Sequence, residues 1–360
     1  MRDTTTEPDR VAEGALKAFV VSVLRRFGIE LPDATQAAEV IVEADLRGVE
    51  THGISALAGR YAELESGAIV ATALPSELRR LGSVIAFEGH HGYGPVLIPR
   101  ILPIAAEAAR SHGIGLVTLR NTSHWGCPAF YSRWLARQGL IGIAISNTNP
   151  AMPLWGSAAK SVGNNPLTIA APRREGEPVV LDISMQQISW GGIAQAKADG
   201  RRLPGQWGYD AAGQPTDDPG EIVASGRVRP MGDHKGSGLA FMFEILTGVL
   251  AAGAICFEVG KHTAAGRPAH YSQTFIAIKP DAIDTADGYF GNVEALCDGG
   301  HAAPLASGFA ELLLPGERSS RTMAERRHKG IPVRRLRAAI EKLAALSDIA
   351  PPPILANQVT

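Results

Sequence analysis

The chain has 360 residues, of which 45% are hydrophobic and 20% are charged, and its formal net charge is −1. This length predicts roughly two domains, and the composition is typical of a globular protein rather than a disordered or fibrous one. A charge balance so close to neutral argues against a nucleic-acid-binding surface or a surface for anionic membranes.

Cysteine usage and hydropathy narrow the class of protein further. Three cysteines without a C-x-x-C pair argue against a disulfide framework and against a metal site. The N-terminus lacks the apolar core of a signal peptide, and no apolar run approaches the ~20 residues of a membrane span. We therefore expect a cytoplasmic protein that binds neither membrane nor nucleic acid, and no metal.

The N-terminal region is predicted to form two helices. Apolar residues at i, i+3 and i+4 spacing predict a helix over residues 16–27 that stops at Gly28. A second helix is predicted to open at Asp33, whose carboxylate would cap backbone N–H groups, and to break at Gly48.

From Val84 onward, β-rich runs alternate with helical patterns. The segment 173–177 joins two apolar runs as a hairpin loop, and Pro99 and Pro103 predict a kink or a late start in the first of these helices. The predicted strands are 114–119, 141–146, 178–183 and 274–278, and the predicted helices are 97–111, 129–138, 237–250 and 333–346. The pattern predicts an α+β fold in which residues 1–83 and 316–360 form a helical domain and residues 84–315 an α+β domain.

Two histidine-containing clusters interrupt the apolar pattern. Residues 51–53 contain His52, just after a predicted helix, and histidine exchanges protons near neutral pH. A histidine at a helix end is nevertheless more often structural. Residues 121–126 contain His124 at a strand end, where α/β folds usually hold ligands; a capped turn is the simpler interpretation there.

Three further clusters are rich in polar residues or glycine. Residues 146–150 have a near twin at 163–166, and each alone is a good turn, as is 315–318. Residues 232–238 precede a predicted helix, and this arrangement either binds an anion such as phosphate, with Lys235 adding a point charge, or is a glycine-rich helix start without a ligand. Because no G-x-G-x-x-G follows a strand and no H-E-x-x-H or G-x-S-x-G is present, the residues alone predict an anion-binding enzyme with two candidate acid/base histidines.

In this order, the clusters resemble the malate/L-lactate dehydrogenase family, which is distinct from the Rossmann-type lactate and malate dehydrogenases. That family includes sulfolactate, ureidoglycolate, 2,3-diketogulonate and Δ1-piperideine-2-carboxylate oxidoreductases. The matching stretches are residues 44–53, 121–126, 147–156, 163–172, 181–184, 233–238 and 314–318. The resemblance implies a non-Rossmann NAD(P)-binding mixed-sheet domain, a homodimer, and NAD or NADP as cofactor.

The resemblance also implies roles for individual residues. His52 corresponds to the proton donor, with Thr51 beside it, and His124 to a second active-site histidine. Substrate contacts are expected from Asn164, Trp190 and Gly191. Cofactor contacts are expected from Thr148, Asp182, Ile183, Ser184, Met185, Gln186, Gln187, Ile188, His234, Lys235, Gly316, Glu317 and Arg318.

Two positions depart from the family pattern. Many members carry an arginine four residues after the histidine, which can bind a substrate carboxylate through two hydrogen bonds; here that position is Ala56. Either Arg47 or Arg60 replaces it, or the substrate has no exposed carboxylate there. Gly192 stands where some reductases place an aspartate, so a Ser-His-Asp relay cannot be assembled. The run 182–188 is closer to the diketogulonate-reductase type.

We therefore predict an NAD(P)H-dependent oxidoreductase that transfers a hydride to or from C2 of a small 2-oxo or 2-hydroxy acid, with His52 supplying the proton. Two alternatives stay open. A cyclic 2-imino acid reductase would use the same hydride and proton geometry. A non-catalytic metabolite-binding protein is suggested by Ala56 and Gly192, although the presence of both histidines argues against it.

Overall fold

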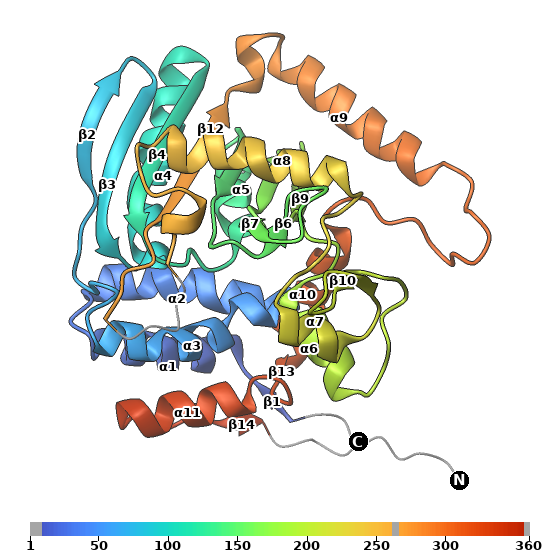
Figure 1. The fold of residues 1–360 in the computed structure, drawn as a ribbon. Coiled ribbons are helices and arrows are strands. Elements are labelled where there is room, and N and C mark those ends of the chain that lie inside the picture. Colours follow the sequence, from blue (N-terminus) through green and yellow to red (C-terminus); the bar gives the residue numbers. More distant parts are fainter. Residues whose placement is uncertain (1–8, 261–265, 356–360) are drawn as a thin grey trace.

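The computed structural model describes residues 9–260 and 266–355 (Figure 1). Residues 1–8, which carry most of the N-terminal segment considered above, lie outside the described residues. The helices are α1 (Glu13–Arg25), α2 (Leu31–Leu46), α3 (Ile54–Glu65), α4 (Gly94–His112), α5 (Pro128–Arg137), α6 (Trp190–Ala198), α7 (Pro219–Ser225), α8 (His234–Glu244), α9 (Ala286–His301), α10 (Glu317–Lys329) and α11 (Arg337–Ser347). Short helical segments are η1 (Glu50–His52), η2 (Ile245–Val249), η3 (Cys256–Glu258) and η4 (Pro280–Ala282).

Within the described residues, the main sheet has seven strands in the order β2-β3-β4-β12-β5-β8-β9. The pair β3 and β4 is parallel and the remaining pairs are antiparallel, which confirms the predicted mixed α+β class. Its strands are β2 (Ser76–Leu81), β3 (Val84–Gly92), β4 (Ile114–Thr122), β5 (Ile141–Ser146), β8 (Leu167–Ala171), β9 (Val179–Ile183) and β12 (Tyr271–Ile278). The smaller pairings use β1 (Arg10–Val11), β6 (Met152–Pro153), β7 (Lys160–Val162), β10 (Gly208–Tyr209), β11 (Pro215–Thr216), β13 (Ile331–Pro332) and β14 (Ile354–Leu355).

Helices cover both faces of this sheet. On one face, the apolar sides of α4 and α5 form a core with Val117 of β4 and Phe275 of β12. On the other face, Phe243 of α8 packs with Ile145 of β5, and α8 crosses the sheet in Figure 1. Because the central strand β12 is covered on both sides, all but two of its residues are buried, and the two exceptions are partly buried.

The two ends of the chain meet in a separate helical layer. Strand β1 pairs with both β13 and β14, and α1, α2, α3 and α11 share one apolar core. Figure 1 shows these helices stacked below the ends of the sheet strands. The division of the chain at residues 83 and 316 into two domains stays a prediction.

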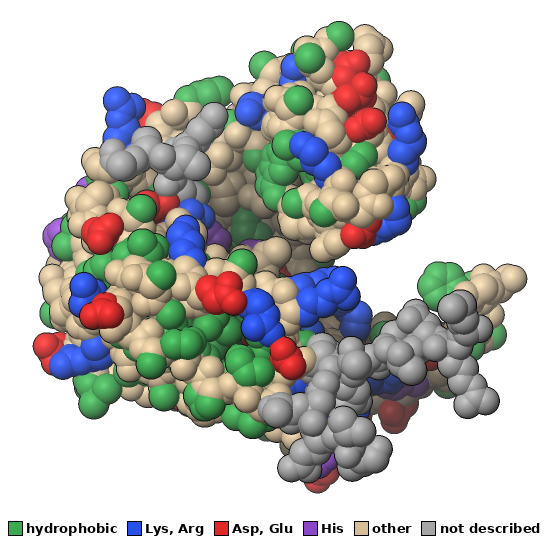
Figure 2. Space-filling model, turned by 90° about the horizontal axis from the view of Figure 1, so that it is seen from below, with side chains coloured by type: hydrophobic (Ala, Val, Ile, Leu, Met, Phe, Trp, Pro, Cys, Tyr) green, Lys and Arg blue, Asp and Glu red, His purple; other side chains and the backbone are tan. Residues whose placement is uncertain are grey.

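A third group of elements, α6, α7, β10 and β11, has a small core of its own that includes Ile193, Leu203 and Ile222. Seen from below, the molecule is hollowed between its main body and a lobe at the upper right (Figure 2). No helix among the described residues is both long and apolar enough to cross a membrane.

Several element boundaries correct the sequence predictions. Helix α2 begins at Leu31 with Glu30 as its N-cap, and Asp33 pairs with Arg100 instead of capping. Helix α4 begins at Gly94 and runs through Pro99 and Pro103, so the late start was wrong.

The remaining corrections fall in the second half of the chain. Helix α8 begins three residues before the predicted start and continues as the π-helical segment η2. Residues 316–318 open α10 rather than forming an isolated turn, and the last predicted helix begins at Arg337 instead of 333.

Candidate active site

The two candidate histidines lie next to each other although 72 positions separate them in the chain. His52 ends η1, just before α3, and His124 follows the end of β4. Their ring centroids are 5.7 Å apart, and the ring planes are inclined by 30°. One small substrate group can therefore contact both rings.

Asp45 of α2 fixes the loop that carries His52. The Asp45 carboxylate accepts a hydrogen bond of 2.9 Å from the backbone N–H of Ile54 and so caps α3. A Cβ atom at Gly53 would lie 2.0 Å from this carboxylate, so only glycine fits there. Burial raises the pKa of Asp45 well above its usual value.

Thr51 orients the ring of His52. The Thr51 hydroxyl lies 3.0 Å from Nδ1 of His52, as expected from the sequence. If Nε2 exchanges the proton with a substrate, Nδ1 must carry the other one, and the Thr51 oxygen then accepts it.

The environment of His52 keeps its ring neutral at neutral pH. Burial, followed by the nearby Arg60 guanidinium, lowers the pKa of His52 from 6.5 to about 4. Both causes act in the same direction, because each disfavours a second positive charge. The free protein therefore presents His52 as a base at pH 7.

The hydrogen bonding of His124 suits a different role. Its Nδ1 accepts a hydrogen bond of 3.1 Å from the backbone N–H of Gly126, so the neutral ring carries its proton on Nε2. Gly94, the first residue of α4, packs so tightly that a Cβ there would lie 2.7 Å from the carbonyl oxygen of His124. His124 is thus a rigidly held hydrogen-bond donor.

The start of α6 brings the predicted substrate residues to the same place. A Cβ at Gly191 would lie 2.6 Å from Cγ2 of Thr51, so Gly191 and Thr51 are in direct contact. Trp190, beside it, is 38% exposed. A side chain at Gly192 would lie 2.9 Å from Ile188, so an aspartate at this position would require Ile188 to move.

Thr148 and Asn164 form a second group, held by the twin polar loops. The Thr148 hydroxyl donates to Oδ1 of Asn164 at 2.8 Å and accepts from the Asn164 backbone N–H at 3.0 Å. The carbonyl oxygen of Asn164 accepts from the backbone N–H of Met185 at 2.9 Å. This contact links Thr148 and Asn164 to the run of predicted cofactor contacts.

Sequence reasoning missed the residue that ties these loops together, Glu244 of α8. Its buried carboxylate accepts hydrogen bonds from Nδ2 of Asn147 at 3.0 Å, Nδ2 of Asn165 at 2.9 Å and the backbone N–H of Cys256 at 2.8 Å. The available signal was a lone acidic residue in an otherwise apolar helical stretch.

The run 182–188 lies beside the loop that precedes α8. Met185 accepts a backbone hydrogen bond from Met231 at 2.8 Å, and Gln187 donates one to Arg229 at 2.9 Å. The side-chain amide of Gln186 is buried and has no hydrogen-bond partner within the described part of the chain. Such an amide costs about 1–3 kcal/mol unless a ligand satisfies it.

The anion site expected at residues 232–238 differs from the expectation in the groups that remain available to an anion. The backbone N–H groups of Lys235 and Gly236 donate to Gly232 and Met231, so the turn itself uses them. The carboxylate of the N-cap, Asp233, pairs with Arg229 at 2.7 Å. An anion at this helix start would therefore meet the exposed side chains of His234 and Lys235 together with the helix dipole.

Asp182 has a structural role that the sequence did not reveal. Its carboxylate accepts a hydrogen bond from the backbone N–H of Ala129, in the first turn of α5. Desolvation raises the pKa of Asp182 to about 6, against the opposing effect of Arg133. Asp182 is nevertheless exposed to solvent along part of its surface.

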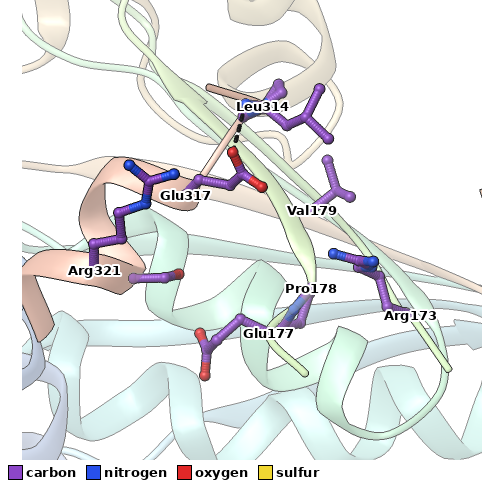
Figure 3. Close-up of a pocket in the computed structure, with 9 residues that line it drawn as sticks. Arg173, Glu177, Pro178, Val179, Leu314, Glu317 and Arg321 are labelled. Atoms are coloured by element: carbon purple, nitrogen blue, oxygen red, sulfur yellow. Dashed lines mark hydrogen bonds between the residues drawn. The ribbon is translucent and has the colours of Figure 1, made fainter. Parts of the chain in front are cut away.

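Gly316, Glu317 and Arg318 lie at the start of α10, against β9. A Cβ at Gly316 would lie 3.1 Å from the backbone nitrogen of Val180. Glu317 accepts from the Leu314 N–H at 2.9 Å and pairs with His301 at 2.9 Å. Both contacts border a pocket of about 210 Å³ between β9 and α10 (Figure 3), lined by Arg173, Glu177, Pro178, Val179, Leu314, Pro315, Glu317, Ser320 and Arg321.

Comparisons with known proteins identify the family of the chain. Residues 11–341 match the family model described as malate/L-lactate dehydrogenase. The 2,3-diketo-L-gulonate reductase of Escherichia coli is 32% identical over 319 residues, which are 88% of this chain and 95% of that protein.

Solved structures of two relatives show the same fold. Sulfolactate dehydrogenase from Methanocaldococcus jannaschii matches with a TM-score of 0.88 and 28% identity, over 94% of this chain and 98% of that one. Δ1-Piperideine-2-carboxylate reductase from Pseudomonas syringae pvar. tomato matches with a TM-score of 0.84 and 27% identity, over 95% and 99%.

Proposed function

Since the chain belongs to the malate/L-lactate dehydrogenase family, we propose that it is an NAD(P)H-dependent oxidoreductase that transfers a hydride to or from C2 of a small 2-oxo or 2-hydroxy acid. The observation that carries the proposal is the pair of histidine rings at 5.7 Å. One ring is a base held by Thr51, and the other is a fixed donor. A carbonyl oxygen that gains or loses a proton needs both functions beside it.

In this proposal, His52 and His124 have separate chemical roles. His52 gives a proton to the C2 oxygen during reduction and takes it back during oxidation. His124 donates a hydrogen bond from Nε2 to the same oxygen and so stabilises the negative charge that develops on it. Asn164, Trp190 and Gly191 border the substrate.

NAD or NADP, when bound, supplies or accepts the hydride. The orphaned amide of Gln186 and the exposed side chains of His234 and Lys235 fit a dinucleotide, since they offer an unsatisfied buried hydrogen-bonding group beside two basic groups. Thr148 and the run 183–188 would hold the dinucleotide, together with Gly316, Glu317 and Arg318 at the start of α10, beside β9. Asp182 fits less well, because it caps α5.

A cyclic 2-imino acid reductase is the second candidate, and the low pKa of His52 favours it. A protonated imine accepts a hydride without receiving a proton, so the neutral ring of His52 would not hinder that reaction. The Δ1-piperideine-2-carboxylate reductase, whose fold this chain shares, has a substrate of this kind in its name.

The test follows NADH and NADPH oxidation by absorbance against a panel of 2-oxo acids, with and without ammonia or methylamine. We expect turnover of at least one 2-oxo acid without added amine. Turnover only with amine, or only of a cyclic imino acid, would favour the second candidate. Absence of turnover across the panel would favour a non-catalytic binding protein.

The proposal includes a homodimer in the cytoplasm. The helix α8 and the segment η2 expose a continuous apolar face that a monomer would leave in water. Its residues are Leu239, Phe241, Met242, Ile245, Leu246, Val249 and Leu250, each between 37% and 52% exposed. All three cysteines are free, as is usual in a reducing compartment.

A further inference from the structure

Arg60 lies on α3, two helical turns after the loop that carries His52. Side chains of a helix lean toward its N-terminus, so a long side chain covers the turn that precedes its own Cα. This lean directs the Arg60 side chain toward the His52 end of α3, while one of its N–H groups reaches Glu63 in the following turn. The Arg60 charge acts on the His52 ring, which agrees with this direction.

The guanidinium of Arg60 is mostly buried, and its hydrogen-bonding capacity is largely unused. Its side chain is 20% exposed, and one N–H group donates to Glu63 at 3.2 Å. Its Nε is buried and has no hydrogen-bond partner among the residues that the structure describes. A buried cationic N–H that stays unpaired is costly, so this geometry points to a ligand that completes it.

Besides pairing with Glu63, Arg60 acts through its charge on the neutral His52 ring. The buried hydroxyls of Tyr93 and Tyr271 also feel the Arg60 charge, and burial raises the pKa of both. The Arg60 charge thus acts on two tyrosines and on the neutral His52 ring, and Glu63 is the one carboxylate among the described residues that pairs with it.

Arg47, the other cation considered from the sequence, is already occupied. It donates to Glu43 at 2.8 Å and to Glu177 at 2.7 Å, and its third contact is Ser320 at 3.3 Å. Its side chain is 1% exposed. Arg47 is part of a closed ionic network and cannot reach a substrate.

We propose that Arg60 binds the carboxylate of the substrate and replaces, from the next turn of α3, the cation that position 56 lacks. The substrate is then an acid whose C1 carboxylate lies along α3 while its C2 group faces His52 and His124. This inference rests on the proposed function for the location of the reacting group, but not for the anion site itself.

The test combines kinetics and binding. Wild type, Arg60→Gln and Arg60→Lys are compared with pyruvate, with oxaloacetate and with methyl pyruvate, whose carboxylate is esterified. We expect Arg60→Gln to raise KM for the two acids about 10-fold or more, with little change for the ester, because hydrogen bonds to charged groups contribute this much. Arg60→Lys should restore part of the affinity. Arg110→Gln, on an exposed part of α4, is the matched control.

Oxamate binding, measured by calorimetry with NADH present, tests the carboxylate site at Arg60 separately from the proposed oxidoreductase function. If the wild type binds oxamate and Arg60→Gln does not, the anion site stands even when no acid is turned over. If Arg60→Gln melts at the wild-type temperature and keeps the wild-type KM and oxamate affinity, Arg60 is not the anchor, although the proposed function stands. If the wild type binds neither oxamate nor any of the acids, both ideas fall. If Arg60→Gln does not fold, Arg60→Lys carries the comparison with a smaller expected rise in KM for the two acids, and a wild-type KM in that variant would then overturn the role of Arg60.

Discussion

The depressed pKa of His52 predicts an unusual pH dependence for the two directions of the reaction. With a pKa of about 4, roughly one ring in a thousand is protonated at pH 7 in the free protein. Reduction needs the protonated ring, so kcat/KM for reduction should fall about tenfold for each pH unit above 5. Oxidation needs the neutral ring, so its kcat/KM should be nearly constant from pH 5 to 8.

The two causes of the lowered His52 pKa provide a control for this prediction. Burial lowers the pKa of His52 most, and the Arg60 charge lowers it further. Arg60→Gln should therefore move the acidic inflection for oxidation to higher pH.

His52→Gln should lower kcat by about 10²- to 10⁴-fold in both directions and abolish the pH dependence, with cofactor affinity nearly unchanged. His124→Gln should lower kcat less than His52→Gln does and should also raise KM, because it removes a hydrogen bond to the C2 oxygen. Initial rates in both directions from pH 5 to 8 measure this, and a kcat/KM for reduction that stays constant over this range would refute the role of His52 as the acid of the free enzyme.

Three further changes test the rest of the site. Lys235→Ala should raise the dissociation constant of NADH or NADPH about 10-fold in a fluorescence titration, and an unchanged constant would remove Lys235 from the cofactor site. Glu244→Gln should destabilise the protein by about 1–3 kcal/mol in thermal unfolding and lower kcat/KM, because an amide N–H would face one of three donors; wild-type values in both assays would refute this. Phe241→Glu, on the exposed face of α8, should shift the protein from dimer to monomer in light scattering, and an unchanged mass would exclude this face as the interface.

Local sequence patterns predicted the elements whose periodicity is strong. The apolar stripe that predicts a helix over residues 16–27 corresponds to α1, and the run 141–146 is β5 as predicted. The hairpin loop at 173–177 joins β8 and β9, which pair antiparallel. The exposed strand β2 has no buried face, so its residues show no alternation that a sequence could reveal. Helix α9 was missed for a similar reason, because Cys297 is its one buried residue in the structure.

The candidate site was harder to predict because long-range contacts define it. His52 and His124 each had a plausible structural role in the sequence, and their contact depends on how η1 meets the end of β4. The choice between Arg47 and Arg60 depends on how fully carboxylates already occupy each of them: Arg47 pairs with Glu43 and with Glu177 of the hairpin loop, whereas Arg60 pairs with Glu63 alone among the described residues. The role of Asp182 likewise depends on its contact with Ala129 of α5.

Helix α10 links the two halves of the proposed site. Its first residue, Glu317, borders the pocket beside β9, and near its other end Arg326 donates to the carbonyl oxygen of Asp45 at 2.5 Å and to Glu50 at 2.8 Å. Asp45 caps α3 and Glu50 opens η1, so the helix that starts at the predicted cofactor contacts also fixes the loop that carries His52. Arg326 therefore connects the C-terminal part of the chain to the loop that carries His52.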